Sequence, residues 1–222
     1  MAGSSRPLEV GIEATGKKTF AWAVEWPGWC RAGKTEELAL EALAVYLPRY
    51  REVAATAGVR PPGLKAAESF EIIGKVAGDA ATEFGVPGKL IAHDSTPVTT
   101  AQAARLSKLV GGAWAVLDRV AASAPASLRK GPRGGGRDRD KMLDHVIGAE
   151  SSYARKLGVK VRVDSYADRD TVNTLREEIL AVLRRASDGE PLVERGWPYR
   201  YMARRIAWHV LDHVWEMEDR SS

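Results

Sequence analysis

The sequence is poor in cysteine and lacks any long apolar run, and both absences restrict what the protein can be. Cys30 is the single cysteine among 222 residues, so a disulfide within the chain cannot form. No stretch approaches the roughly 20 apolar residues that a membrane-spanning helix needs. The first residues also lack the apolar segment of a secretory signal. We therefore expect a cytoplasmic protein without membrane contacts.

Charge is unevenly distributed along the chain, whose formal net charge is +4. Residues 1–97 are close to neutral, which argues against a nucleic-acid partner for that half. Residues 98–222 carry the basic excess, much of it in one loop. This loop either attracts anions or is simply solvated, because Asp138 and Asp140 interrupt the basic run. Its basic residues are Arg129, Lys130, Arg133, Arg137, Arg139 and Lys141.

Two-residue alternation predicts two strands near the start of the chain, at residues 7–14 and 19–26. Gly16-Lys17-Lys18 supplies the turn between them, and Pro27-Gly28 ends the pairing. We expect one face of the second strand to carry Phe20, Trp22, Val24 and Trp26.

A helix and a further strand are predicted next. Thr35 is a good N-cap, two glutamates follow it in the first turn, and Pro48 marks a kink or stop. After a linker with Pro61-Pro62-Gly63, residues 70–76 are predicted as a strand. Residues 77–98 are rich in Gly, Pro, Asp and Thr and are interpreted as a connection.

From about residue 99 the apolar spacing changes to that of helices. Four amphipathic helices cannot bury their apolar stripes singly, so a four-helix bundle is the natural solution, and the fold class is α+β. Gly134-Gly135-Gly136 lies in the loop between the first two helices. The stripes are Leu106, Leu109, Ala113, Leu117 and Val120; Met142, Val146, Ala149, Tyr153 and Leu157; Val172, Leu175, Ile179 and Leu183; and Met202, Ile206, His209, His213 and Met217.

Three of the four histidines are placed to meet in this bundle. His209 and His213 lie four residues apart on the last predicted helix, hence on one face and about 6 Å apart at Cβ. His145, on the second helix, completes a three-histidine metal site with an open position, the arrangement that a catalytic metal needs. The alternative is three core histidines satisfied by carboxylates. The zincin motif H-E-x-x-H is absent, because Val210 stands at the glutamate position.

Acidic residues beside these histidines are candidates for further roles. Glu216 lies three residues after His213 on the same face and is predicted as the catalytic group, with metal ligand or partner of a ligand as its alternatives. Asp144 and Asp212 each adjoin a histidine. Because adjacent helical residues point about 100° apart, these two aspartates suit partners of ligands better than ligands.

Two other sites in the sequence invite a catalytic interpretation. Cys30 is not expected to be a nucleophile, because only Arg31 stands near it to lower its pKa. His93-Asp94 is either a general-base pair or an ordinary part of the connection.

The second half resembles a known superfamily. The segment Asp144-His145-Val146-Ile147-Gly148-Ala149-Glu150, followed by Tyr153 and Leu157-Gly158, resembles the second helix of the DinB-like superfamily, and Ala207-Trp208-His209-Val210-Leu211-Asp212-His213 resembles its last helix. The resemblance implies a metal-binding four-helix bundle with His145, His209 and His213 as ligands. It also implies kinship with thiol transferases and mycothiol-dependent maleylpyruvate isomerases. The chain departs from many members in having Glu216-Met217-Glu218-Asp219 after the last ligand.

The first half resembles a different family. Phe20-Ala21-Trp22-Ala23-Val24-Glu25, Pro27-Gly28-Trp29-Cys30 and Gly33-Lys34-Thr35-Glu36-Glu37 are similar to the HicB-like fold. That resemblance implies a small sheet packed by a helix, which neutralises a toxin in some proteins and is an accessory domain in others. We thus expect a HicB-like module at residues 1–62, a connecting segment with a strand at 63–98, and a DinB-like bundle at 99–222.

These patterns lead to two functional hypotheses. The first is a metal-dependent enzyme that performs thiol transfer or thiol-dependent isomerisation on a small-molecule substrate. Its cofactors would be a divalent metal, zinc before nickel, manganese or iron, and a low-molecular-weight thiol. The second is a non-enzymatic, antitoxin-like interaction protein whose bundle is a scaffold. A homodimer is compatible with both. A catalytic metal site needs an open coordination position, whereas a structural site is closed.

Overall fold

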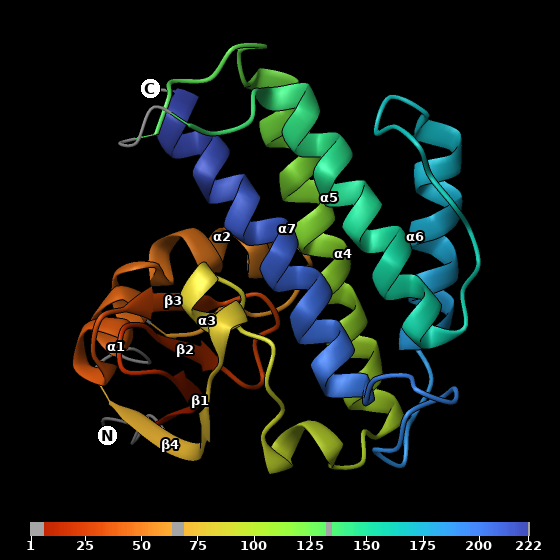
Figure 1. Cartoon of the computed structure of the whole chain (residues 1–222). Coiled ribbons are helices and arrows are strands. Elements are labelled where there is room, and N and C mark those ends of the chain that lie inside the picture. Colours follow the sequence, from red (N-terminus) through yellow and green to blue (C-terminus); the bar gives the residue numbers. More distant parts are fainter. Residues whose placement is uncertain (1–6, 64–68, 132–134, 222) are drawn as a thin grey trace.

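The computed structural model describes residues 7–63, 69–131 and 135–221. In this part of the chain, four strands form one mixed sheet with the order β3-β2-β1-β4. β1 pairs antiparallel with β2 and parallel with β4, and β2 pairs antiparallel with β3. The fold is therefore α+β, with the sheet in the first half and long helices in the second (Figure 1). The strands are β1 (Leu8–Ala14), β2 (Thr19–Ala23), β3 (Cys30–Gly33) and β4 (Phe70–Ala77).

The predicted strands are present, but the second is shorter than predicted and one further strand was missed. The second strand ends at Ala23 and not at residue 26, because the chain turns there. The turn passes through Gly28, whose φ is 90°, and Trp29 O accepts a hydrogen bond from Ala23 N at 3.0 Å. Pro27-Gly28 therefore leads into a third strand, β3, that was not predicted. The predicted strand at 70–76 is confirmed as β4, which belongs to the same sheet as β1.

Both faces of the central strand β2 are buried. Phe20, Trp22 and Val24 face one way and pack with Trp208 of the last helix. The opposite face joins the main core, in which Trp26 also lies. That core includes the helices α1 (Glu36–Val45) and α2 (Leu47–Thr56).

The helical segment after β3 begins as predicted, and its break lies close to the kink or stop predicted at Pro48. Thr35 Oγ1 accepts a hydrogen bond from Leu38 N, which confirms the N-cap. The structure has two helices where one was predicted, because the chain breaks at Tyr46 and restarts with Pro48 in the first turn of α2. The connection 77–98 contains the short helix α3 (Ala80–Phe84) and the 3₁₀ turn η2 (Ala92–Ser95).

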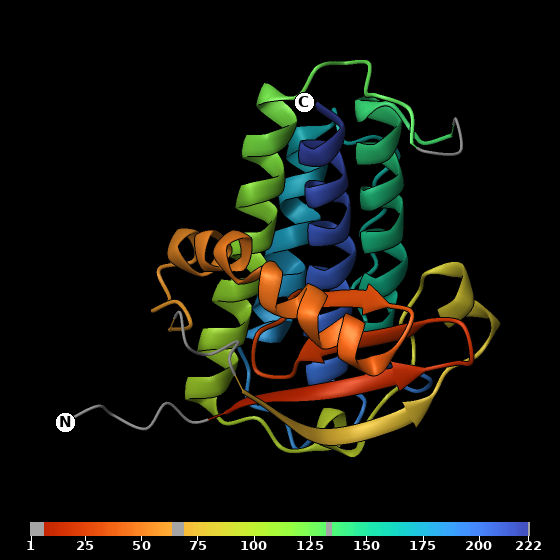
Figure 2. The same ribbon diagram turned by 90° about the vertical axis from the view of Figure 1, so that its left-hand side faces the viewer.

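Helices α4 to α7 pack side by side, and their predicted apolar stripes lie largely in the core (Figures 1 and 2). Along the colour bar of Figure 1, α4 and α7 run one way and α5 and α6 the other.

Of the predicted basic loop and its glycines, Arg133 and Gly134 lie outside the described residues. None of the described helices is both long and apolar enough to cross a membrane. The bounds are α4 (Thr100–Ser123), α5 (Arg139–Ala154), α6 (Arg169–Leu183) and α7 (Tyr199–Ser221), with a 3₁₀ turn, η3 (Arg155–Leu157), after α5.

Helix α7 joins the two halves of the molecule. Every residue from Tyr199 to Leu211 is buried, since α7 contacts α4, α5 and η2 and also receives Trp22 of the sheet. The turn at Gly28 approaches it closely: a Cβ on Gly28 would lie 2.9 Å from Ala207 O. The most enclosed helix of the fold therefore carries two of the predicted ligands.

Candidate metal centre

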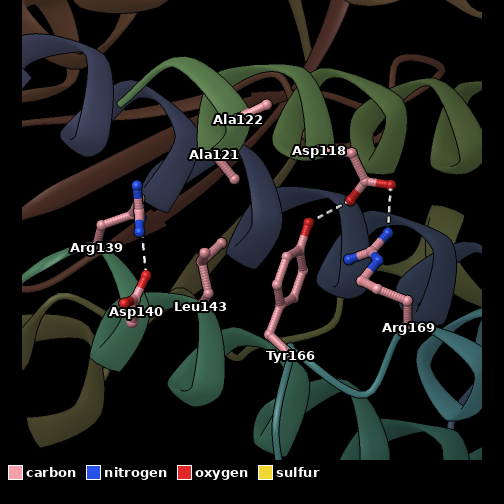
Figure 3. A pocket seen from close by; sticks show the side chains of 8 residues that line it. All are labelled: Asp118, Ala121, Ala122, Arg139, Asp140, Leu143, Tyr166 and Arg169. Atoms are coloured by element: carbon pink, nitrogen blue, oxygen red, sulfur yellow. Dashed lines mark hydrogen bonds and ion pairs between the residues drawn. The ribbon is translucent and has the colours of Figure 1, made fainter. Parts of the chain in front are cut away.

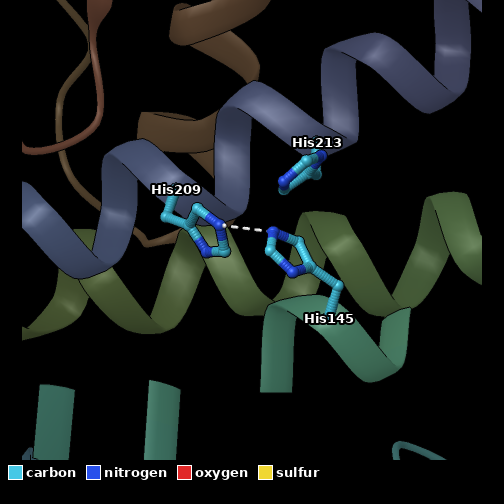
Figure 4. A group of neighbouring side chains, drawn as sticks. All are labelled: His145, His209 and His213. Carbon is cyan, nitrogen blue, oxygen red and sulfur yellow. Dashed lines mark hydrogen bonds between the residues drawn. The ribbon is translucent and has the colours of Figure 1, made fainter. Parts of the chain in front are cut away.

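The antiparallel contact between α5 and α7 brings the predicted ligands together. His209 Nε2 lies 3.2 Å from His145 Nε2, across 64 positions of sequence (Figure 4). One ring nitrogen from each of His145, His209 and His213 can be chosen so that all three lie within 4.8 Å of one another. The ring centroids are 4.8 to 5.1 Å apart. The predicted convergence of the three imidazoles is therefore present.

The spacing of one pair of these nitrogens matches that of two ligands of a metal ion. Two nitrogens that share a tetrahedral ion at 2.0–2.1 Å are about 3.3 Å apart, close to the separation of His145 and His209 Nε2. His209 Nδ1 is also enclosed and has no hydrogen-bond partner among the described residues. Satisfied core histidines would have their own acceptors, but of these three histidines only His213 contacts a carboxylate of a described residue. The donor set thus suits a divalent ion that accepts imidazole ligands.

Burial keeps the imidazoles of His209 and His145 neutral. His209 is 8% exposed, and its burial, aided by the neighbouring His213 and His145, lowers its pKa to about 2. Burial also lowers the pKa of the partly exposed His145, with the positive charge of Arg137 as the next cause. A neutral ring offers a lone pair, so neither histidine has to lose a proton near pH 7 in order to bind a metal.

Glu216 is bonded to one of the predicted ligands. Its Oε2 lies 3.0 Å from His213 Nδ1, and its Oε1 accepts a hydrogen bond from Arg220 Nη1 at 2.7 Å. The hydrogen bond with His213 holds the pKa of Glu216 below its usual range. When His213 Nδ1 donates to this carboxylate, its Nε2 is left with a free lone pair. Glu216 is therefore the hydrogen-bond partner of His213, one of the predicted ligands. The catalytic role predicted for Glu216 stays a prediction.

The two aspartates next to histidines have other partners. Asp144 Oδ1 accepts hydrogen bonds from Ser165 Oγ at 3.0 Å and Tyr166 N at 2.8 Å, which fixes the loop before α6. Asp212 Oδ1 lies 3.4 Å from Arg31 Nη1, which links α7 to β3. Among the described residues neither aspartate forms a hydrogen bond with a histidine, so neither is a hydrogen-bonded partner of a predicted ligand.

Two residues near the three histidines were not predicted from the sequence to belong to the site. Tyr153 of α5 has its ring 5.9 Å from that of His209, and its hydroxyl accepts a hydrogen bond from Arg205 Nη2 at 3.2 Å. The available signal was helical spacing: Arg205 lies four residues before His209, and Tyr153 lies eight after His145. Both therefore extend the faces that carry the histidines.

The other predicted candidates lie away from the three histidines. His93 Nε2 is 3.1 Å from Glu25 Oε1, so this histidine is not part of the metal centre. Asp94 is buried, accepts a hydrogen bond from Ile91 N at 3.0 Å, and pairs with Arg204 Nη2 at 2.8 Å. Burial raises the pKa of Cys30 to about 12, which agrees with the expectation that this thiol is not a nucleophile.

The basic loop is only partly available to a ligand. Arg129 donates to Asp219 O, Lys130 lies 3.4 Å from Asp138 Oδ1, and Arg139 Nε lies 2.7 Å from Asp140 Oδ1. Arg137 and Lys141 differ from these three, because neither is part of an ion pair with a described residue. Arg137 is the one that lies near the histidines, and its charge acts on two of them.

A separate hollow of about 460 Å³ lies between α4, α5 and the start of α6 (Figure 3). Its charged residues pair with each other: Arg139 with Asp140, and Arg169 Nη2 with Asp118 Oδ2 at 2.8 Å. Tyr166 OH also donates to Asp118. The histidines do not line this hollow, and its charges are already compensated, so it offers a weaker candidate site. Its lining residues are Asp118, Ala121, Ala122, Arg139, Asp140, Leu143, Tyr166 and Arg169.

No protein-family model, curated protein or solved structure matches the chain, so the DinB-like and HicB-like resemblances rest on the motifs in its sequence.

Proposed function

We propose that the protein is a metal-dependent enzyme of the DinB-like superfamily, in which His145, His209 and His213 hold one divalent cation. The observation that carries the proposal is the approach of three imidazole nitrogens to within 4.8 Å, from two helices that meet only in the folded chain. Zinc is the first choice because imidazole suits it, and nickel, manganese and iron accept the same ligands.

The proposed reaction is thiol transfer, or a thiol-dependent isomerisation, on a small-molecule substrate. The chemistry that such an ion supplies is a lowered pKa of a bound thiol or water, which gives a nucleophile at neutral pH. The preference for a low-molecular-weight thiol comes from the superfamily resemblance of the helix sequences around His145 and His213.

The chain's own residues prepare this site. Burial keeps His209 neutral, so its lone pair is available without loss of a proton. Glu216 orients the ring of His213, and Arg220 in turn holds Glu216 through a 2.7 Å hydrogen bond. The proposed task of Glu216 in the reaction is to accept a proton from the thiol once the substrate is in place.

The proposed task of the N-terminal sheet, the HicB-like module, is to support α7. Trp22 and Phe20 pack with Trp208, which precedes His209 in the chain. Arg31 of β3 stacks over Tyr46, with 4.0 Å from its guanidinium carbon to the ring centroid, and pairs with Asp212. These contacts fix the helix that carries two of the three proposed ligands.

Metal analysis of the purified full-length protein tests the proposal. We expect about one divalent ion per chain and turnover of a cysteine-derived thiol with a small electrophile only when that ion is present. Unchanged metal content in His209→Ala would contradict the site. Metal binding without turnover of any thiol would leave the interaction-protein hypothesis as the better account.

A further inference from the structure

Three arginines in the first half of α7 are buried, and one of them lacks a counter-charge. Arg200 Nη1 lies 2.7 Å from Glu25 Oε1, and Arg204 Nη2 lies 2.8 Å from Asp94 Oδ2. Arg205 is equally enclosed, at 9% exposure, yet it forms no ion pair with any residue that the structure describes. An unpaired buried charge is costly, so a protein retains one where something else neutralises it.

The hydrogen bonds of Arg205 leave much of its guanidinium unused. Nη1 donates to Pro87 O at 2.8 Å, and Nη2 donates to Tyr153 OH at 3.2 Å. Both acceptors are uncharged. A guanidinium has five N–H groups, so three are left over, and Nε has no acceptor among the described residues. The guanidinium also lies over the rings of Trp208 and Tyr153, with its carbon 4.7 and 5.3 Å from their centroids. Its charge therefore faces neutral partners and aromatic rings, and no carboxylate among the described residues pairs with it.

Arg205 lies directly beside the three-histidine centre. It precedes His209 by four residues on α7, so the two share one face of the helix. Tyr153 stands between them on α5: the Arg205 guanidinium carbon is 5.3 Å from its ring centroid, and the His209 ring is 5.9 Å away. Arg205 also contributes to the lowered pKa of His209.

Two further residues are relevant to this region: the cation Arg137 and the short side chain of Ala149. Arg137, in the loop before α5, is exposed, has no ion pair among the described residues and acts on His145 and His209. On α5, Ala149 lies one turn from both His145 and Tyr153 and is partly exposed. Ala149 contributes only a methyl group to the face of α5 between His145 and Tyr153.

We propose that Arg205 binds the carboxylate of a small anionic substrate next to the three-histidine centre, with Arg137 as the outer cation. That the bound carboxylate belongs to a substrate rests on the proposed function, whereas carboxylate binding by Arg205 does not require the metal. Two neighbouring N–H groups of a guanidinium match the two oxygens of a carboxylate, and such charge-assisted pairs are strong. The one buried cation, Arg205, matches a single carboxylate group, and the outer cation Arg137 can accommodate the second carboxylate of a dicarboxylate, whereas a doubly charged phosphate would place both of its charges on Arg205.

Calorimetric titration of succinate into the full chain, metal-free and zinc-loaded, tests this proposal. Succinamide serves as the neutral analogue and inorganic phosphate as the competing oxyanion. We expect the metal-free wild type to bind succinate and not succinamide, and Arg205→Gln to bind succinate at least about tenfold more weakly, a loss of about 1.4 kcal/mol. Arg162→Gln is the matched control, because Arg162 is 76% exposed and pairs with Asp164.

Each outcome bears on a separate claim. Equal succinate affinity in Arg205→Gln and Arg162→Gln overturns the proposal, and tighter binding of phosphate than succinate overturns the choice of carboxylate. Failure of zinc to bind the histidines defeats the proposed function instead. If Arg205→Gln does not fold, two measurements on the wild-type protein test succinate binding instead. Succinate must shift an arginine Nε–H resonance in its proton–nitrogen spectrum and raise its melting temperature at constant ionic strength, and no shift refutes binding at Arg205.

Discussion

His213 and Glu216 are joined along one face of α7, with Nδ1 and Oε2 3.0 Å apart. This contact determines which nitrogen of His213 is free to face His145 and His209. A carboxylate in this position raises the basicity of a ligand and fixes its ring, and losing such a partner costs about 10- to 100-fold in metal affinity.

We expect Glu216→Gln to weaken zinc binding by about one order of magnitude and to lower turnover further, because the carboxylate is also the proposed proton acceptor. Competition with a chromogenic chelator and a turnover assay on the same preparation measure both effects. Glu218→Gln is the control, since Glu218 makes only a 3.9 Å ion pair with Arg49. Metal loss in Glu216→Gln equal to that of a histidine variant would make Glu216 a ligand.

Replacing His209 or His213 with Ala should abolish stoichiometric metal binding and any thiol-transfer activity, because each removes one of three ligands. The fourth histidine provides an internal control: His93→Ala should keep the metal, since His93 bonds to Glu25 outside the centre. The measurement is metal content by mass spectrometry of dialysed protein. Equal metal content in all three variants would show that the metal, if any, is bound elsewhere.

The buried His209 should make the metal-free protein less stable in acid. Its folded pKa is about 2, far below the ordinary value of 6.5, so only the unfolded chain takes up a proton between these values. The free energy of unfolding should therefore fall as pH drops below about 6.5, by up to about 1.4 kcal/mol per pH unit from this group.

Urea unfolding of metal-free wild type and His209→Gln at pH 6.5, 5.5 and 4.5 checks this pH dependence. The variant should show a shallower decline, because its residue 209 does not titrate. Parallel curves for the two proteins would mean that His209 is protonated in the fold as readily as in the unfolded chain.

The features predicted well from the sequence depend on local spacing. The i,i+4 pair on α7, the cap at Thr35 and the apolar stripes of the bundle follow from the geometry of a single helix. The meeting of His145 with that pair came from the family resemblance of the two helices, since no spacing within one element relates residues 64 positions apart.

The features that were missed depend on contacts between distant segments. β3 is four residues long, so it is too short to show an alternation, and its pairing with β2 is set by the turn at Gly28. Asp144 was misjudged because the loop at Ser165 and Tyr166 captures its carboxylate. The uncompensated charge of Arg205 is visible only once the partners of Arg200 and Arg204 are known, because all three look alike in the sequence.

A fourth prediction concerns the buried ion pair inside the bundle. Glu150 is 1% exposed, accepts a hydrogen bond from Trp114 Nε1 at 2.7 Å, and lies 3.4 Å from Arg176 Nε. Arg176→Met should destabilise the protein by about 3–5 kcal/mol, because it leaves a buried carboxylate without its cation. Asp118 keeps Arg169 as a partner, so the loss falls mainly on Glu150.

The double variant Glu150→Gln/Arg176→Met should recover much of that stability. Glutamine still accepts the hydrogen bond from Trp114 and carries no charge that needs Arg176. Urea unfolding of the two single variants and the double variant gives the coupling energy. Additive losses would contradict an energetic link between the two side chains.

Gly28 should be the most sensitive glycine in the contact between the sheet and α7. Its φ of 90° strains any other residue, and an added Cβ would lie 2.6 Å from Leu211 Cδ1 and 2.9 Å from Ala207 O. Gly58 is the matched control: its φ is 63°, but no atom lies within 4 Å of an added Cβ. We expect Gly58→Ala to cost about 1 kcal/mol from backbone strain alone, and Gly28→Ala to cost about 1–3 kcal/mol more from overpacking. Because the clash pushes on α7 at Ala207 and Leu211, on either side of His209 in the chain, Gly28→Ala should also weaken zinc binding, whereas Gly58→Ala should not. Equal unfolding free energies and equal zinc affinities for the two variants would show that the turn at Gly28 does not position the metal centre.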